Sequence, residues 1–195
     1  MAPRKARALL GYLAATARPT RRERLCELFW ELPDDPRGSL RWALSKIREV
    51  VNADGTNRVE ADRERVRLAT RQVDVDVVQI RGRLRDDPGD IAPGVLREMA
   101  DVLGQPFLDG LDAAGGEDFQ IWLRAEREDA HVLYLNVLRR LALHSGIDRS
   151  EAVKWARLWK EATPLEEEAA RKRVARLTLA GRAEEAEEIA RDVDR

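Results

Sequence analysis

The sequence is poor in cysteine and in long hydrophobic runs. Cys26 is the only cysteine, which excludes a disulfide within the chain and fits a reducing cytosol. It lies beside Leu25, Leu28 and Phe29, so we expect a half-buried structural thiol. No apolar run approaches about 18 residues, and the first residues lack the apolar core of a signal peptide. These absences predict a soluble, cytoplasmic protein with no membrane partner.

Motifs for catalysis and cofactor binding are also missing. The sequence contains no phosphate-binding loop, dinucleotide-binding glycine pattern, zinc-protease motif, nucleophile elbow or paired Cys-x-x-Cys. His131 and His144 stand alone, without a second histidine or a cysteine at metal-ligand spacing. Carboxylates occur in runs such as residues 166–168, which are typical of solvated helix faces. We therefore expect no enzyme activity, no catalytic residues, no metal and no cofactor.

Charge is divided unevenly along the chain, although the formal net charge is −1. Residues 1–72 carry 16 Lys and Arg against 10 Asp and Glu, a net charge of +6. Residues 73–195 carry 19 basic against 26 acidic residues, a net charge of −7. A basic segment followed by an acidic one predicts a polyanionic partner for the first segment only. The alternative is chance blocks of charge on solvated faces.

The N-terminal segment begins with two predicted helices. Residues 6–17 form the first, with leucines spaced to face a core. Residues 20–23, Thr-Arg-Arg-Glu, have the form of a capping box, in which the threonine accepts from the N3 amide and the glutamate reaches back. A second helix then follows, with apolar residues at helical spacing: Leu25, Leu28, Phe29 and Leu32.

A third predicted helix, residues 36–51, is strongly amphipathic. Asp35 offers an N-cap, and Pro36 fits position N1 because its missing amide proton is not needed there. At about 100° per residue, one side forms a core face, made of Leu40, Ala43, Leu44, Ile47, Val50 and Val51. The opposite side carries Arg41, Trp42, Ser45 and Glu49, with Lys46 and Arg48 on its flanks. Solubility alone does not require two arginines, a lysine and an indole on one exposed side.

After residue 57 the hydrophobic period changes from that of a helix to that of a strand. Residues 58–61 and 65–69 alternate apolar and polar side chains, and Asp62, Arg63 and Glu64 form the turn between them. Three helices followed by a basic hairpin is the order of a winged helix-turn-helix. We therefore predict such a DNA-binding domain over residues 1–72.

From Val73 onward the pattern is almost wholly helical. The predicted helices cover roughly residues 75–85, 92–103, 117–144, 149–162, 165–180 and 182–193. Segments 150–159 and 183–193 repeat at a spacing of 34 residues, the period of tetratricopeptide (TPR) repeats. We predict an all-α, TPR-like domain over residues 73–195, with an ordinary antiparallel helical bundle as the alternative. The joint, residues 69–78, lacks Gly and Pro, which favours an ordered connection over a flexible tether.

Four stretches resemble, in order, the SARP type of bacterial transcriptional activators. They are RKARALLGYLAA, RERLCELFW, GSLRWALSKIREVV and PFLDGLDAAGGEDFQIWLRAEREDAHVLYLNVLRRLA. The most specific pieces are residues 39–51 and the pattern QPFLDGL…WLRAERE, residues 105–128. In that family a winged-helix DNA-binding module precedes an all-helical, TPR-like bacterial transcriptional activator domain (BTAD). The resemblance covers nearly the whole chain and implies the same two domains here.

The resemblance identifies residues 36–51 as the recognition helix and residues 58–69 as the wing. An α-helix fits the major groove, where arginine bonds guanine and serine reaches base or phosphate. The candidate DNA-binding residues are Arg21, Arg22, Arg37, Arg41, Trp42, Ser45, Lys46, Arg48, Arg63 and Arg65.

These candidates have different expected roles. Arg21 and Arg22, at the start of the second helix, are placed for phosphates. Arg63 and the nearby Arg65 on the hairpin are expected in the adjacent minor groove. Trp42 is expected to pack on a sugar or a thymine methyl group, with packing against the second domain as the alternative. For each arginine the alternative is a solvated surface charge.

Two further expectations follow from the resemblance. The family's winged helix opens with a small antiparallel sheet, but Met1 lies only five residues before the first predicted helix. We therefore expect the N-terminal sheet to be missing, either because the start is trimmed or misassigned or because the module is reduced. Residues 73–195 are implied to mediate self-association, as a homodimer on direct repeats of promoter DNA, or contact with RNA polymerase. A helical-repeat adaptor that binds proteins and has reduced or lost DNA binding is the rival interpretation. The missing sheet favours the adaptor, whereas the basic N-terminal segment opposes it.

Overall fold

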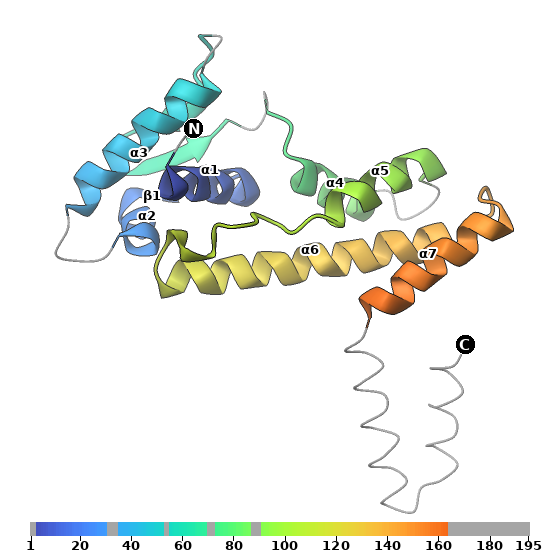
Figure 1. Cartoon of the computed structure of the whole chain (residues 1–195). Coiled ribbons are helices and arrows are strands. Elements are labelled where there is room, and N and C mark those ends of the chain that lie inside the picture. The colour runs from blue at the N-terminus through green and yellow to red at the C-terminus, as the bar shows by residue number, and fades with distance from the viewer. Residues whose placement is uncertain (1–2, 31–34, 53–54, 70–72, 87–90, 164–195) are drawn as a thin grey trace, which may run out of the picture. The chain divides into compact units, whose positions relative to one another are not determined.

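The computed structural model describes residues 3–30, 35–52, 55–69, 73–86 and 91–163 (Figure 1). In chain order the elements are α1 (Arg4–Thr16), β1 (Thr20–Arg21), α2 (Arg22–Phe29), α3 (Pro36–Val51), β2 (Val59–Ala61), β3 (Arg65–Leu68), α4 (Asp76–Asp86), α5 (Pro93–Leu103), η2 (Asp112–Ala114), α6 (Glu117–Leu143) and α7 (Arg149–Ala162). The described chain is mainly helical with a small antiparallel sheet, as predicted. None of its helices is long and apolar enough to cross a lipid bilayer.

The chain forms two compact units, Met1–Tyr134 and Leu135–Arg195, which divide within α6. The predicted domain boundary after residue 72 stays a prediction. Helices α4 to α7 confirm four of the six helices expected after Val73. The other two, at 165–180 and 182–193, and the second copy of the 34-residue repeat lie outside the described residues.

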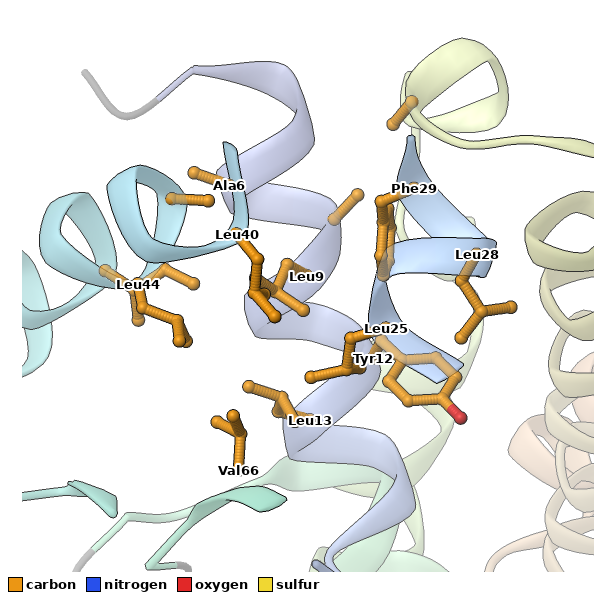
Figure 2. Close-up of a cluster of buried hydrophobic side chains, with 14 of the residues drawn as sticks. Ala6, Leu9, Tyr12, Leu13, Leu25, Leu28, Phe29, Leu40, Leu44 and Val66 are labelled. Carbon is orange, nitrogen blue, oxygen red and sulfur yellow. The ribbon is translucent and has the colours of Figure 1, made fainter. Parts of the chain in front are cut away.

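Helices α1, α2 and α3 share one hydrophobic core (Figure 2). Leu9 and Leu13 of α1 are fully buried. In Figure 2, Leu40 of α3 lies next to Leu9, and Leu44 lies on the same side of α1. Val66 of β3 lies below Leu13. Burying an aliphatic side chain of this size contributes roughly 1.5–3 kcal/mol. This shared core fixes α3 and the sheet against α1.

The start of α3 confirms the predicted cap. The Asp35 carboxylate accepts a hydrogen bond from the Gly38 amide at 2.9 Å, and Pro36 occupies the first turn. The predicted core face is buried from Leu40 to Ile47, and Val51 packs partly against the core. Val50 is an exception, because 60% of its surface is exposed. At about 100° per residue it lies at the edge of the apolar stripe, where the core no longer covers it.

The predicted hairpin is present, and its two strands pair antiparallel. Val59 pairs with Leu68 and Ala61 pairs with Val66. Val59, Val66 and Leu68 are buried, so one face of the hairpin joins the core of the helices. The opposite, polar face is exposed, as alternation in a half-buried strand requires.

A third strand, β1, was not predicted, and the capping box was wrong. Thr20 pairs with Val66 and Arg21 with Arg65, so the sheet has the order β1-β3-β2. Helix α2 begins at Arg22, and no side chain caps it. The backbone of Thr20 is held by strand pairing, which competes with the turn that a capping threonine needs. Helix α2 ends at Phe29, and Leu32 lies outside the described residues.

The core of α1, α2 and α3 continues past residue 72. Leu111, Phe119 and Leu123 are buried in the same cluster as the leucines of α1. Val73, at the predicted ordered joint, packs against this cluster as well. The segment before α6 is tied to α2 by a hydrogen bond from the Gly116 amide to the Leu28 carbonyl at 2.9 Å.

Candidate nucleic-acid interface

An open groove of about 880 Å³ lies between the start of α2, the start of α3 and the tip of the β2–β3 hairpin. We call it the arginine groove. Its basic lining consists of Arg21, Arg22, Arg37, Arg41 and Arg63, and the other lining residues are Glu23, Cys26, Leu40, Ala61, Asp62 and Glu64. Five of the ten predicted DNA-binding residues therefore line one surface, although three separate segments contribute them. The lining has an excess of positive charge.

The exposed arginines of this groove have weak ion-pair partners, or none, among the described residues. The side chain of Arg37 is 80% exposed, and its Nη2 lies 3.9 Å from Glu23 Oε1. An exposed pair at that distance stabilises little, so the charge of Arg37 stays available. Arg21, Arg41 and Arg63 make no ion pair with any residue that the structure describes. The charges of these three arginines are thus exposed and not paired with a described residue.

Arg22 differs from the other four arginines because one of its side-chain donors, Nε, is hydrogen-bonded to the hairpin. Its Nε donates to the Asp62 carbonyl at 2.8 Å, and its backbone N–H donates to the Glu64 carbonyl at 2.8 Å. The side chain is half-buried. Arg22 thus joins the beginning of α2 to the hairpin tip.

The hairpin tip is also organised from within. Asp62 Oδ1 accepts from the backbone N–H groups of Arg65 and Glu64, both at 2.7 Å. These hydrogen bonds, first that of Arg65 and then that of Glu64, hold the pKa of the Asp62 carboxyl below its usual value. An aspartate at the start of a turn is a known signal for such bonding, so the role of Asp62 was accessible from the sequence.

The outer side of α3 is open to solvent. Trp42 is 54% exposed, which is unusual for so large an apolar side chain. Arg41 and Ser45 are exposed on the same side of the helix. The expected face of Arg41, Trp42 and Ser45 is therefore present, next to the arginine groove.

Three predicted residues lie elsewhere. Lys46 Nζ pairs with Glu49 along the helix, at 2.8 Å from its Oε1. Arg48 is half-buried, and its Nη2 lies 3.5 Å from the Val59 carbonyl, which links α3 to β2. Arg65 is exposed but borders a different hollow, which Pro19, Glu60 and Arg67 also line.

Cys26 lines the arginine groove as a half-buried thiol, as expected. Burial raises the pKa of this thiol, as is typical of a structural cysteine. Within the described ranges, no group of three or more His, Cys, Asp and Glu side chains is placed to hold a metal ion.

Comparison of the chain with protein-family models, curated proteins and solved structures finds no match. The fold and the arginine groove therefore carry the functional proposal.

Proposed function

We propose that the protein is a sequence-specific DNA-binding transcriptional regulator whose N-terminal part is a winged helix-turn-helix. The element order α1-β1-α2-α3-β2-β3, with β1 pairing to the hairpin, supports this proposal. In such a domain α3 is the recognition helix, which enters the major groove, and the β2–β3 hairpin is the wing.

The observation that carries the proposal is the convergence of five arginines on the arginine groove. A cluster of cations beside an exposed helix suits the phosphate backbone of duplex DNA, which supplies regularly spaced negative charges. A chance distribution of surface charge does not favour one groove shared by three separate segments.

The exposed side chains divide into two roles. Arg41, Trp42 and Ser45 would contact base edges, because they lie on the outer side of α3. Arg21 and Arg37 would bind phosphates, which fix the register of the helix without reading sequence. Arg63, at the hairpin tip, would enter the adjacent minor groove.

The helical part after residue 72 would contact other proteins. Its net charge of −7 makes it an unsuitable DNA surface and favours contact with proteins. By its resemblance to the SARP activators, we propose that it mediates self-association on direct repeats of promoter DNA or contacts RNA polymerase.

The salt dependence of DNA binding tests this function. The full chain is titrated into a fluorescently labelled duplex of random sequence while anisotropy is measured. If three to five arginines neutralise phosphates, the affinity should fall about 40-fold to 500-fold between roughly 50 and 200 mM salt, since the slope is about −0.9 per phosphate. The variant Arg37→Ala should lower that slope by about 1, whereas Arg83→Ala on α4 should leave it unchanged.

The rival function, a helical-repeat adaptor, predicts a different outcome. An adaptor would not bind the duplex at the lower salt concentration. Alternatively, it would bind weakly, with the same affinity and salt dependence in the Arg37→Ala and Arg83→Ala variants. The exposed Trp42 would then belong to a protein interface, since aromatic side chains are enriched there.

A further inference from the structure

Arg22 makes two hydrogen bonds to the hairpin tip, and their acceptors belong to the residues directly before and after Arg63. The carbonyl of Asp62 accepts from the side chain of Arg22, and the carbonyl of Glu64 accepts from its backbone N–H. Both N···O distances are 2.8 Å. The residue between them, Arg63, keeps an exposed side chain at the tip.

We propose that Arg22 is a positioning residue: it fixes the hairpin tip, residues 62–64, against the start of α2, so that Arg63 meets DNA from a preset position. This proposal rests on the proposed function and changes the role of Arg22, which was expected to bind phosphate. Ordering the tip before binding removes part of the entropy cost that a mobile tip would incur on the DNA.

The two roles make different demands on the side chain of Arg22. The donor to Asp62 is Nε, the nitrogen nearest to the aliphatic stem of Arg22, and the acceptor is a neutral carbonyl. The bond therefore needs a donor at that position but does not need the positive charge. Binding a phosphate, in contrast, needs the charge itself.

The glutamine side chain provides the test, because its Nε2 lies at the same number of bonds from Cα as Nε of arginine. Arg22→Gln keeps a donor for the Asp62 carbonyl and removes the charge. Arg22→Leu removes both and keeps a stem of similar length. Arg21→Gln is the matched control, because Arg21 is the neighbouring arginine of the arginine groove and its side chain makes no ion pair with a described residue.

The first measurement needs no DNA. Backbone ¹⁵N order parameters of residues 62–64 are compared in the free full-length proteins. We expect equally high order parameters in the wild type, in Arg22→Gln and in Arg21→Gln, and clearly lower ones in Arg22→Leu, in which only the Asp62 turn and the backbone bond of residue 22 still hold the tip. A tip that stays equally ordered in Arg22→Leu would overturn the proposal.

The second measurement is the affinity for a random-sequence duplex at low salt. We expect Arg22→Gln to stay within about twofold of the wild type and Arg22→Leu to bind up to about tenfold more weakly, the effect of losing one hydrogen bond. In an Arg63→Ala background the loss caused by Arg22→Leu should shrink to about twofold or less, because the two residues then act through one element. Equal losses for Gln and Leu would assign Arg22 to a phosphate and refute positioning.

The two measurements fail independently. If no variant and no wild-type protein binds DNA, the proposed function is wrong, while the order of the free tip still decides whether Arg22 positions it. Thermal melting checks that each variant is folded. If Arg22→Leu is unstable, Arg22→Gln alone separates the roles, since positioning predicts wild-type affinity and phosphate binding predicts a clear loss.

Discussion

Replacing Gly115 by alanine should destabilise the protein, because this glycine lies where the segment before α6 crosses α2. An added Cβ would lie 2.6 Å from the Leu28 carbonyl oxygen and 2.6 Å from the Phe119 Cβ. Neither neighbour can yield easily. The carbonyl belongs to the backbone of α2 and accepts the Gly116 amide, and Phe119 is fully buried with its ring centroid 4.8 Å from that of Phe29.

The magnitude follows from these two contacts. Overpacking a filled core costs roughly 1–3 kcal/mol, and loss of the hydrogen bond to Leu28 costs about 1 kcal/mol. We therefore expect Gly115→Ala to lower the free energy of unfolding by about 2–4 kcal/mol. Urea denaturation of the full chain, followed by circular dichroism, measures this change.

Gly82→Ala is the matched control for this substitution. Gly82 lies within α4, and an added Cβ would meet nothing within 4 Å. Alanine there should raise stability by roughly 0.5–1 kcal/mol, because a helical glycine loses more backbone entropy on folding. An unfolding midpoint of Gly115→Ala equal to that of the wild type would refute the close packing of α2 against the segment before α6.

Two further predictions concern the elements that surround the arginine groove. Asp35→Ala should destabilise the protein by about 1 kcal/mol through loss of the α3 cap, whereas Asp35→Asn should retain most of the wild-type stability because asparagine also caps helices. Thermal melting compares the two variants. An equal loss of stability in both would contradict capping by Asp35. The lowered pKa of Asp62 means that its turn is complete above about pH 4 and is lost as the pH falls through that lowered pKa. Amide shifts of Glu64 and Arg65 should follow this titration, and a midpoint above the usual aspartate value would contradict it.

Local signals in the sequence were sufficient to predict α3 and the hairpin. Asp35 and Pro36 mark the start of α3 because capping depends on neighbours within one turn. The hairpin register follows from alternation, since a slip of β2 by one residue would turn Val59 and Ala61 away from the face on which Leu68 and Val66 are buried. The four described helices after Val73 follow from helical spacing in the same way.

Features that depend on distant parts of the chain could not be predicted. Strand β1 exists only because β3, more than 40 positions away, offers a free edge to Thr20 and Arg21. The ion pair of Arg24 with Asp118 joins α2 to α6 and has no signature in residue spacing. The same is true of the bond between Arg22 and the Asp62 carbonyl.

The candidate site was predicted as a set of residues, not as a surface. The exposed side of α3 was accessible because helical spacing separates Arg41 from the core face. Which arginines would share a groove depended on tertiary packing. The hairpin tip lies near the starts of α2 and α3, so Arg63 shares the groove with Arg37, whereas Arg48 points to β2. Charge alone did not distinguish these cases.

Selection of binding sites from a random-sequence duplex library by the full chain tests the central claim most directly. We expect the wild type to enrich one defined motif and Arg83→Ala, a substitution of an exposed helical arginine on α4, to enrich the same one. Arg41→Ala should lose the preference at one or two positions of that motif and bind the selected site about 1–3 kcal/mol more weakly. A wild-type protein that enriches no motif, or an Arg41→Ala variant that selects the full motif with wild-type affinity, would contradict DNA reading by α3.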